Sequence, residues 1–261
     1  KPYVKGNKND ANDAEAICEA ISRPAMRFVA VKTERQQTLQ AEHRVRARVI
    51  KSRTALCNEI RGFLGEFGVV LPVGISQLRK ALPEILSQQE QWDDRFMRLL
   101  CELAEELRML DDRVAGHDRR LAEAAREDIC IQRLMKIEGI GVITASAMVA
   151  LLGDATQFKN GREMAAYVGL VPRQHSSGGK QQLGHISKRG DSYLRTLVIH
   201  GARSVLKTCA GKEDRRSQWL QSVAERRNRN IATVALANKN VRIAWAVLSR
   251  GEDYHGKQVA G

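Results

Sequence analysis

Two serines followed by two glycines, residues 176–179, are the part of this chain whose residue types most directly suggest chemistry. A serine hydroxyl is a poor nucleophile unless a base or a metal ion assists it, and His175 is the nearest candidate base in the sequence. Serines before glycines commonly mark only a turn. Here the segment lies among cations, which could hold a phosphodiester and stabilise charge developing on its oxygens. These cations are Arg173, Lys180, Lys188, Arg189 and Arg195. A loop that only holds phosphate and a loop whose serine, Ser176 or Ser177, attacks it are both open interpretations.

Asp10 and Asp13 stand three residues apart in a segment that is expected to be helical. On a helix, positions i and i+3 share a face, so the two carboxylates converge. Such a pair favours a bound cation, and Mg²⁺ takes oxygen ligands while keeping waters for phosphate chemistry. The pair supplies only two ligands, however, and acids are also common in the first turn of a solvated helix. The spacing leaves both interpretations open.

The segment IEGIG, residues 137–141, has the pattern of the turn in a helix-hairpin-helix motif. Gly139 and Gly141 permit a tight turn, after which backbone N–H groups at the next helix start can face a phosphate. Such a contact meets only the nucleic-acid backbone and reads no sequence. A plain packing joint between two short helices is the alternative.

The net charge of +13 is concentrated in the last third of the chain. Residues 171–261 contain 17 Lys or Arg and 6 Asp or Glu, a net charge of +11, whereas residues 1–130 are close to neutral. This asymmetry indicates a polyanionic partner, most simply nucleic acid, in preference to a merely soluble basic face.

The elements that must position these residues are expected to be mainly helices, because aromatic residues make up only 5% of the chain and prolines number five. Helices are expected at 9–22, 33–67 and 93–127, with a short one near 76–88. In 93–127 the apolar positions alternate steps of four and three over about four heptads. An antiparallel hairpin with 33–67 is the simplest arrangement, and a dimeric coiled coil is the rival. His117 on this seam is interpreted as a packed polar residue rather than a ligand.

The C-terminal half is expected to hold short helices around 137–141, then a helix and a short extended segment before the serine loop. Further helices are expected at 191–209, 213–226 and 231–251, the last as an apolar closing helix. The loop region itself is expected to be irregular or β.

No apolar run is long enough to span a bilayer, and no signal peptide is visible. The five cysteines are scattered, and no Cys-x-x-Cys occurs, so a zinc site is not expected. We therefore expect reduced thiols and a cytoplasmic location.

Five segments in this order carry a resemblance over nearly the whole chain. They are KNDANDAEAI, IEGIGVITASAMVALLGD, FKNGREMAAYVGLVPRQHSSGGK, GHISKRGDSYLRTLVIHGAR and ALANKNVRIAWAVL. The chain resembles the DEDD-type insertion-sequence transposases related to the Piv DNA invertase, a family of bridge-RNA-guided recombinases with serine and RuvC-like active-site components.

The resemblance implies a bacterial DNA transposase that recombines DNA through a composite site. Four acids of a RuvC-like domain would bind Mg²⁺, and the last two of them match Asp10 and Asp13. A serine nucleophile just before a glycine matches Ser177 rather than Ser176. The resemblance further implies that acids and serine meet between protomers of a homo-oligomer, a dimer or tetramer, and that a guide RNA encoded by the element selects the DNA.

From pattern and resemblance together we expect a mainly α fold in four parts. Residues 1–32 would be the remnant of a RuvC-like nuclease domain, and 33–130 a long antiparallel coiled-coil hairpin. Residues 131–254 would be a helical transposase domain with the helix-hairpin-helix and the serine loop, and 255–261 a frayed tail. Because the first Asp and the Glu have no counterpart, an N-terminal portion is expected to be missing. The fragment alone is expected to bind nucleic acid without recombining it.

Three rival functions stay open. A non-catalytic nucleic-acid-binding helix-hairpin-helix module would bind DNA with steep salt dependence but would not capture it covalently. A junction nuclease of the RuvC type would need the acids and be indifferent to Ser177. A structural coiled-coil scaffold is disfavoured because the positive charge is concentrated in residues 171–261.

Overall fold

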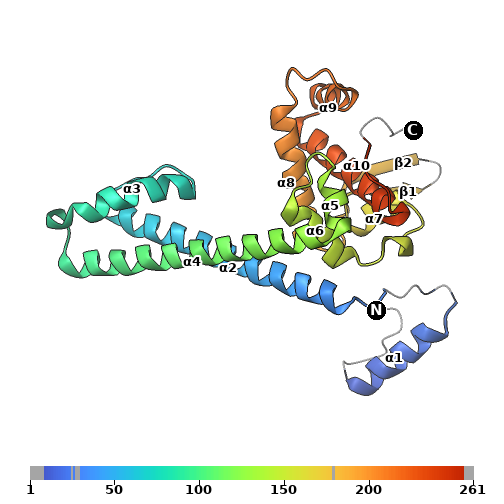
Figure 1. The fold of residues 1–261 in the computed structure, drawn as a ribbon, viewed down its shortest axis with the longest axis horizontal. Coiled ribbons are helices and arrows are strands. Elements are labelled where there is room, and N and C mark those ends of the chain that lie inside the picture. Colours follow the sequence, from blue (N-terminus) through green and yellow to red (C-terminus); the bar gives the residue numbers. More distant parts are fainter. Residues whose placement is uncertain (1–8, 25, 27–29, 178–179, 256–261) are drawn as a thin grey trace. The chain divides into compact units, whose positions relative to one another are not determined.

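The computed structural model describes residues 9–24, 26, 30–177 and 180–255, without the side chains of residues 89, 175–177 and 180–181. Within these residues the chain is mainly helical, and its sheet has two strands (Figure 1), which confirms the expected mainly α class. The chain divides into two compact units, Lys1–Val31 and Lys32–Gly261. The RuvC-like character of the first residues and the four expected domain ranges stay predictions.

The first unit contains the helix α1, Asp10–Ser22, in agreement with the expected helix at 9–22. The Asn9 side chain accepts a hydrogen bond from the backbone N–H of Asn12 at 2.7 Å and caps the helix start. No residue of α1 is buried, and the side chains of Ile17 and Ile21 are 60% and 64% exposed. Within the described residues of this unit, the apolar side chains of α1 are therefore not buried.

The second unit begins with two long helices, α2 (Glu34–Glu66) and α4 (Asp94–Glu127), close to their expected bounds. At the start of α2, Thr33 and Gln36 form a reciprocal capping box. At the start of α4, the Asp93 side chain accepts hydrogen bonds from the backbone N–H groups of Arg95 and Phe96. Local chemistry at these caps accounts for where both helices begin.

Ion pairs across the two long helices show that they run antiparallel and side by side (Figure 1). Arg46 pairs with Asp118, and Arg53 pairs with Asp111, so early residues of α2 meet late residues of α4. The supercoiled packing of a coiled coil stays a prediction. On the same seam His117 is 6% exposed, with Nδ1 2.7 Å from a carboxylate oxygen of Glu42, as expected for a packed polar residue.

A first hydrophobic cluster fills the space between α2, α4 and the short helix α3, Ile75–Ser87, which lies close to the expected helix near 76–88. Leu56, Ile60, Leu78 and Leu100 are among its buried members. The 3₁₀ turn η1 (Gln89–Gln91) leads from α3 toward α4.

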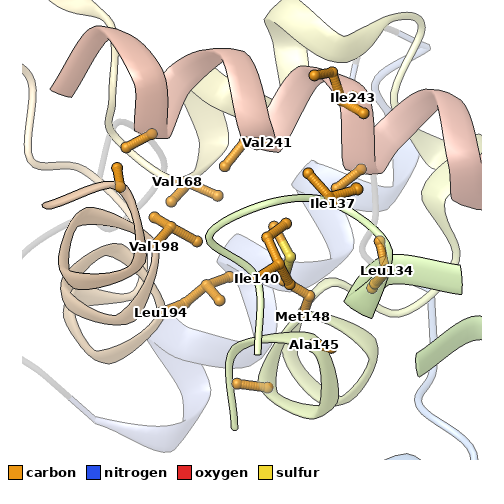
Figure 2. Close-up of a cluster of buried hydrophobic side chains, with 14 of the residues drawn as sticks. Leu134, Ile137, Ile140, Ala145, Met148, Val168, Leu194, Val198, Val241 and Ile243 are labelled. Carbon is orange, nitrogen blue, oxygen red and sulfur yellow. The ribbon is translucent and has the colours of Figure 1, made fainter. Parts of the chain in front are cut away.

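The C-terminal part of this unit packs around the last helix, α10, which contacts four other helices, α5, α7, α8 and α9. The helices are α5 (Ile129–Met135), α6 (Val142–Leu152), η2 (Ala155–Gln157), α7 (Gly161–Tyr167), α8 (Ser192–Thr208), α9 (Arg215–Arg226) and α10 (Arg229–Arg250). Figure 2 shows the core between them, with Ile140 and Met148 at its centre and Val198 and Val241 reaching in from α8 and α10.

The expected irregular or β region is an antiparallel hairpin of β1 (Pro172–Ser177) and β2 (Lys180–Ile186). The register pairs Pro172 with Ile186 and Ser177 with Lys180, with an irregularity between Pro172 and Gln174. Of the expected frayed tail, 256–261 lies outside the described residues. Just before it, Asp253 pairs with Lys136 at 2.6 Å.

A buried histidine joins the helical hairpin to the C-terminal part. His43 of α2 is 1% exposed, and its two ring nitrogens lie 3.0 Å from Tyr193 Oη and 3.0 Å from Ser146 Oγ. Because the Ser146 hydroxyl also donates to the Val142 carbonyl at 2.7 Å, the neutral ring satisfies both contacts when Nε2–H donates to Ser146 and Nδ1 accepts from Tyr193. Burial lowers the pKa of His43 to about 4.

Candidate nucleic-acid interface

The serine segment is presented at the turn of the β-hairpin. Ser177 is the last residue of β1 and Lys180 is the first residue of β2. The side chains of His175, Ser176, Ser177 and Lys180 lie outside the described part of the structure. The backbone register alone brings Ser177 and Lys180 together as a directly paired couple.

The base of the hairpin is held by two glycines that permit close backbone approaches. A Cβ built on Gly190 would lie 2.0 Å from the Tyr167 carbonyl oxygen, and one on Gly169 would lie 2.2 Å from the Arg189 carbonyl oxygen. Both glycines have positive φ, 74° and 79°. The segment 188–190 is thereby pressed against the end of α7, and the backbone of Lys188 takes a left-handed φ of 54°.

The predicted cations at this base have different roles in the structure. Arg173, Lys188 and Arg189 are exposed. Arg195 is half-buried, and its Nη1 donates to the backbone carbonyls of Val168 at 3.1 Å and Arg189 at 2.9 Å. These bonds give Arg195 a structural role, because they connect the segment before α8 to the end of α7. Phosphate contacts by these residues stay predictions.

The two glycines of the predicted helix-hairpin-helix turn also differ. Gly139 has a φ of 88°, and a Cβ built on it would lie 2.9 Å from Val205 of α8. Gly141 caps the N-terminus of α6, is exposed, and has open space where a Cβ would lie. Packing against α8 therefore accounts for Gly139, as in the alternative of a packing joint. Backbone contacts to nucleic acid at Gly139 and at Gly141 stay predictions.

Asp10 and Asp13 lie in the first turn of α1, Asp10 exposed and Asp13 half-buried. No group of three or more His, Cys, Asp or Glu side chains able to hold a metal ion occurs among the residues that the structure describes. Within that part of the chain, the two acids are thus the whole of the predicted metal site.

A groove of about 1530 Å³ along α10 was missed by the sequence analysis. We call it the α10 groove; α7, β2, α9 and α10 contribute to its lining, which includes Arg162, Lys188, Trp219, Lys239, Arg242 and Trp245. Of the predicted cations whose side chains the structure describes, only Lys188 lines it. Residues 231–251 were interpreted as an apolar closing helix. The overlooked signal was the pair of cations three residues apart, Lys239 and Arg242, on that helix.

None of the described helices is both long enough and apolar enough to cross a membrane.

Comparisons with known proteins match two segments of the chain to transposase families. Residues 131–218 match the Transposase IS116/IS110/IS902 family, and residues 1–68 match a DEDD-type transposase family named for IS110.

Individual relatives extend over almost the whole chain. A probable family 20 transposase of Pseudomonas aeruginosa is 56% identical over 256 residues, which cover 97% of this chain and 76% of the relative. The transposase for insertion sequence element IS1111A of Coxiella burnetii is 49% identical, over 97% of this chain and 70% of the relative. The transposase for insertion sequence element IS1328 of Yersinia enterocolitica is 40% identical, over 96% and 75%. The chain therefore belongs to the IS110/IS116 family of insertion-sequence transposases.

Proposed function

We propose that this transposase cuts and rejoins DNA through the hydroxyl of Ser177. In the proposed step Ser177 Oγ attacks a phosphodiester phosphorus, and the bond from that phosphorus to one ester oxygen of the strand breaks. The serine proton leaves to a base, and the released strand end takes up a proton to become a hydroxyl. Rejoining is the attack of a strand hydroxyl on the serine-bound phosphorus, which returns the proton to Ser177.

The observation that carries this proposal is the strand register of the hairpin. Ser177 pairs directly with Lys180, and directly paired residues of an antiparallel ladder have Cα atoms about 4.5–5.5 Å apart. The backbone register thus supports a proposal that pairs the position of a hydroxyl-bearing residue with that of a cationic residue. Ser176 pairs instead with Gln181, which has no charge.

The exposed cations at the hairpin base support the same proposal. Arg173, Lys188 and Arg189 would hold phosphates further along the same strand, away from the attacked one, because they lie at the other end of the hairpin from Ser177. Because Arg195 is bound to two backbone carbonyls, it would contribute mainly by holding the segment in place.

The acids of α1 are suitable ligands for a divalent metal ion, but two of them are too few for a catalytic metal site. Mg²⁺ takes carboxylate oxygens, and Asp10 and Asp13 present two carboxylates within one helical turn. The described residues hold no third ligand nearby, so the set is incomplete for a catalytic site. We propose that Asp10 and Asp13 bind Mg²⁺ together with ligands from outside residues 9–24.

The remaining proposals concern partners. A homo-oligomer, dimer or tetramer, would bring the hairpin of one protomer to the acids of another, and a guide RNA encoded by the element would select the DNA. Residues 1–261 alone would bind nucleic acid without recombining it, since the described residues place no third metal ligand with Asp10 and Asp13. A non-catalytic nucleic-acid-binding module and a RuvC-type junction nuclease are the alternatives.

The test is covalent capture of DNA by the full-length protein in the presence of Mg²⁺. Ser177→Ala is expected to abolish an adduct that resists denaturation, whereas the matched variant Ser176→Ala is expected to retain it. An adduct that persists in Ser177→Ala overturns the assignment of the nucleophile. Binding without any adduct in the unaltered protein would favour the non-catalytic module, and cleavage without an adduct would favour the junction nuclease.

A further inference from the structure

A cluster of four cations lies where α9 packs on α10. Arg215 and Arg216 come from the start of α9, and Lys239 and Arg242 from the middle of α10. Within the part of the chain that the structure describes, none of the four pairs with a carboxylate. Burial and the three neighbouring guanidinium groups lower the pKa of Lys239, with burial as the larger cause. The cluster therefore carries mutual repulsion that an anion would relieve.

Lys239 is held at the wall of the α10 groove by an aromatic ring. Its Nζ lies 4.5 Å from the ring centroid of Trp219, a cation–π contact that keeps the ammonium group beside the groove. Arg242, one turn further along α10, is exposed and lines the same groove. Two cations thus share one face of α10.

Hydrogen bonds and a close backbone contact hold several residues of the groove lining in place. The indole N–H of Trp245 donates to the carbonyl oxygens of Ala155 at 3.2 Å and Phe158 at 3.1 Å. The Asn238 side chain donates to the Leu170 carbonyl at 3.2 Å. A Cβ built on Gly161 would lie 2.9 Å from the Arg242 backbone, so α7 and α10 are in close contact. A ligand would therefore meet a preformed surface.

The charge of the described lining is positive. It includes five Lys or Arg residues and two acids, Glu252 and Asp253, and the carboxylate of Asp253 already pairs with Lys136 and Arg133. Lys239, Arg242 and Arg250 follow one face of α10 over roughly 16 Å, at 1.5 Å per residue. A duplex strand places roughly five phosphates along that distance.

We propose that the α10 groove is a second nucleic-acid-binding site of this transposase, in which Lys239 and Arg242 contact consecutive phosphates of a sugar–phosphate backbone. The described lining of the groove does not include Ser177, and it reaches the base of the hairpin at Lys188. This inference rests on the proposed function only in taking nucleic acid as the partner.

The experiment measures binding of labelled duplex DNA, single-stranded DNA and RNA of about 20 nucleotides across a range of salt concentrations. The double variant Lys239→Gln, Arg242→Gln is expected to bind at least one of these about tenfold more weakly. The slope of log affinity against log salt should fall by about two, because two phosphate contacts are lost. The probe with the largest loss identifies whether the groove takes DNA or RNA.

The matched control is Arg48→Gln, Lys51→Gln, which removes two exposed cations at the same helical spacing on α2. It is expected to change affinity by less than about threefold, with the slope nearly intact. The charge-retaining variant Lys239→Arg, Arg242→Lys should keep the slope, which separates lost charge from damaged folding. Unchanged affinity and slope for all three probes in the glutamine double variant would overturn the proposal.

The experiments distinguish a failure of the groove proposal from a failure of the proposal that Ser177 is the nucleophile. Ser177→Ala should retain the full salt slope while losing the covalent adduct. If the adduct persists in Ser177→Ala but the groove variant binds weakly, the groove stands and the nucleophile assignment fails. If the groove variant binds normally while Ser177→Ala loses the adduct, the assignment of the nucleophile stands and the groove proposal fails.

Discussion

Gly201 of α8 and Gly139 of the α5–α6 turn approach so closely that a Cβ built on Gly201 would lie 1.9 Å from the Gly139 carbonyl oxygen. Since that atom is backbone, it cannot rotate away. We expect Gly201→Ala to lower the free energy of unfolding by about 1–3 kcal/mol, despite the better helix propensity of alanine. A reduced thermal midpoint would show this.

The same substitution at Gly62 of α2 is the control, because nothing lies within 4 Å of a Cβ built there. Gly62→Ala is expected to raise stability by up to about 1 kcal/mol. Equal midpoints for the two variants would contradict the close approach at Gly201.

The stability of the joint at His43 should depend on pH. The folded pKa of His43, about 4, lies below the ordinary value of 6.5, so the unfolded chain takes up the proton first as the pH falls. The contribution of neutral His43 is therefore complete above about pH 6.5 and is lost as the pH falls toward 4, a total of about 3 kcal/mol.

Thermal unfolding of the unaltered protein and of His43→Gln, followed between these pH values, checks this expectation. The variant should be less stable at neutral pH and lose less stability on acidification. His200→Gln, at an exposed histidine of α8, should keep the slope of the unaltered protein. A His43→Gln variant with the full acid sensitivity would show that another group controls it.

Asp111 of α4 holds three helices together, because it accepts hydrogen bonds from Arg53 of α2 and Arg79 of α3. Arg53 Nη1 lies 3.1 Å from Asp111 Oδ1, and Arg79 Nε lies 2.8 Å from Asp111 Oδ2. Asp111→Asn is expected to cost about 1–2 kcal/mol of stability, because two guanidinium groups lose their charged partner.

Asp112→Asn is the neighbouring control. Asp112 pairs only with Arg108 in the described residues, and the two side chains are 71% and 65% exposed. An exposed pair of this kind contributes little, so we expect a change below about 0.5 kcal/mol. Chemical denaturation of both variants measures the difference, and equal losses would remove the special role of Asp111.

If Asp10 and Asp13 bind a metal ion, their substitution should lower DNA cleavage without weakening nucleic-acid binding. Asp10→Asn and Asp13→Asn in the full-length protein are each expected to lower DNA cleavage by about 100-fold or more while leaving nucleic-acid binding intact. Addition of a chelator should have the same effect on the unaltered protein. Glu34→Gln, which also removes an acid from a first helical turn, should leave cleavage unchanged. Cleavage that survives both aspartate variants would exclude these acids from the metal site.

Local features accounted for most of the elements that the sequence analysis predicted. The caps Asn9, Thr33, Asp93 and Asp191 act within three residues of themselves, so the starts of α1, α2, α4 and α8 can be predicted from nearby residues alone. The apolar spacing of 93–127 likewise predicted which side of α4 is buried, from Leu100 to Leu121. The family resemblance supplied the transposase class, which the comparisons confirm.

Contacts between distant residues could not be predicted in this way. The candidate phosphate contact at Gly139 stays a prediction, but its close approach to Gly201 and Val205, 62 and 66 positions later, could not be inferred from its neighbours. His43 carried no signal of its own, because its partners Ser146 and Tyr193 belong to other helices. Lys239 carried no signal of its own within an apolar helix, because its cation–π partner Trp219 belongs to α9.

The sequence by itself determined the helical composition, the concentration of positive charge in residues 171–261 and the membership of a transposase family. Only the tertiary structure decided which glycines serve packing and which cations of α10 face a groove. The physical reason is that caps and periodicity act over a few residues, whereas burial and electrostatic fields depend on groups that folding brings together from distant positions.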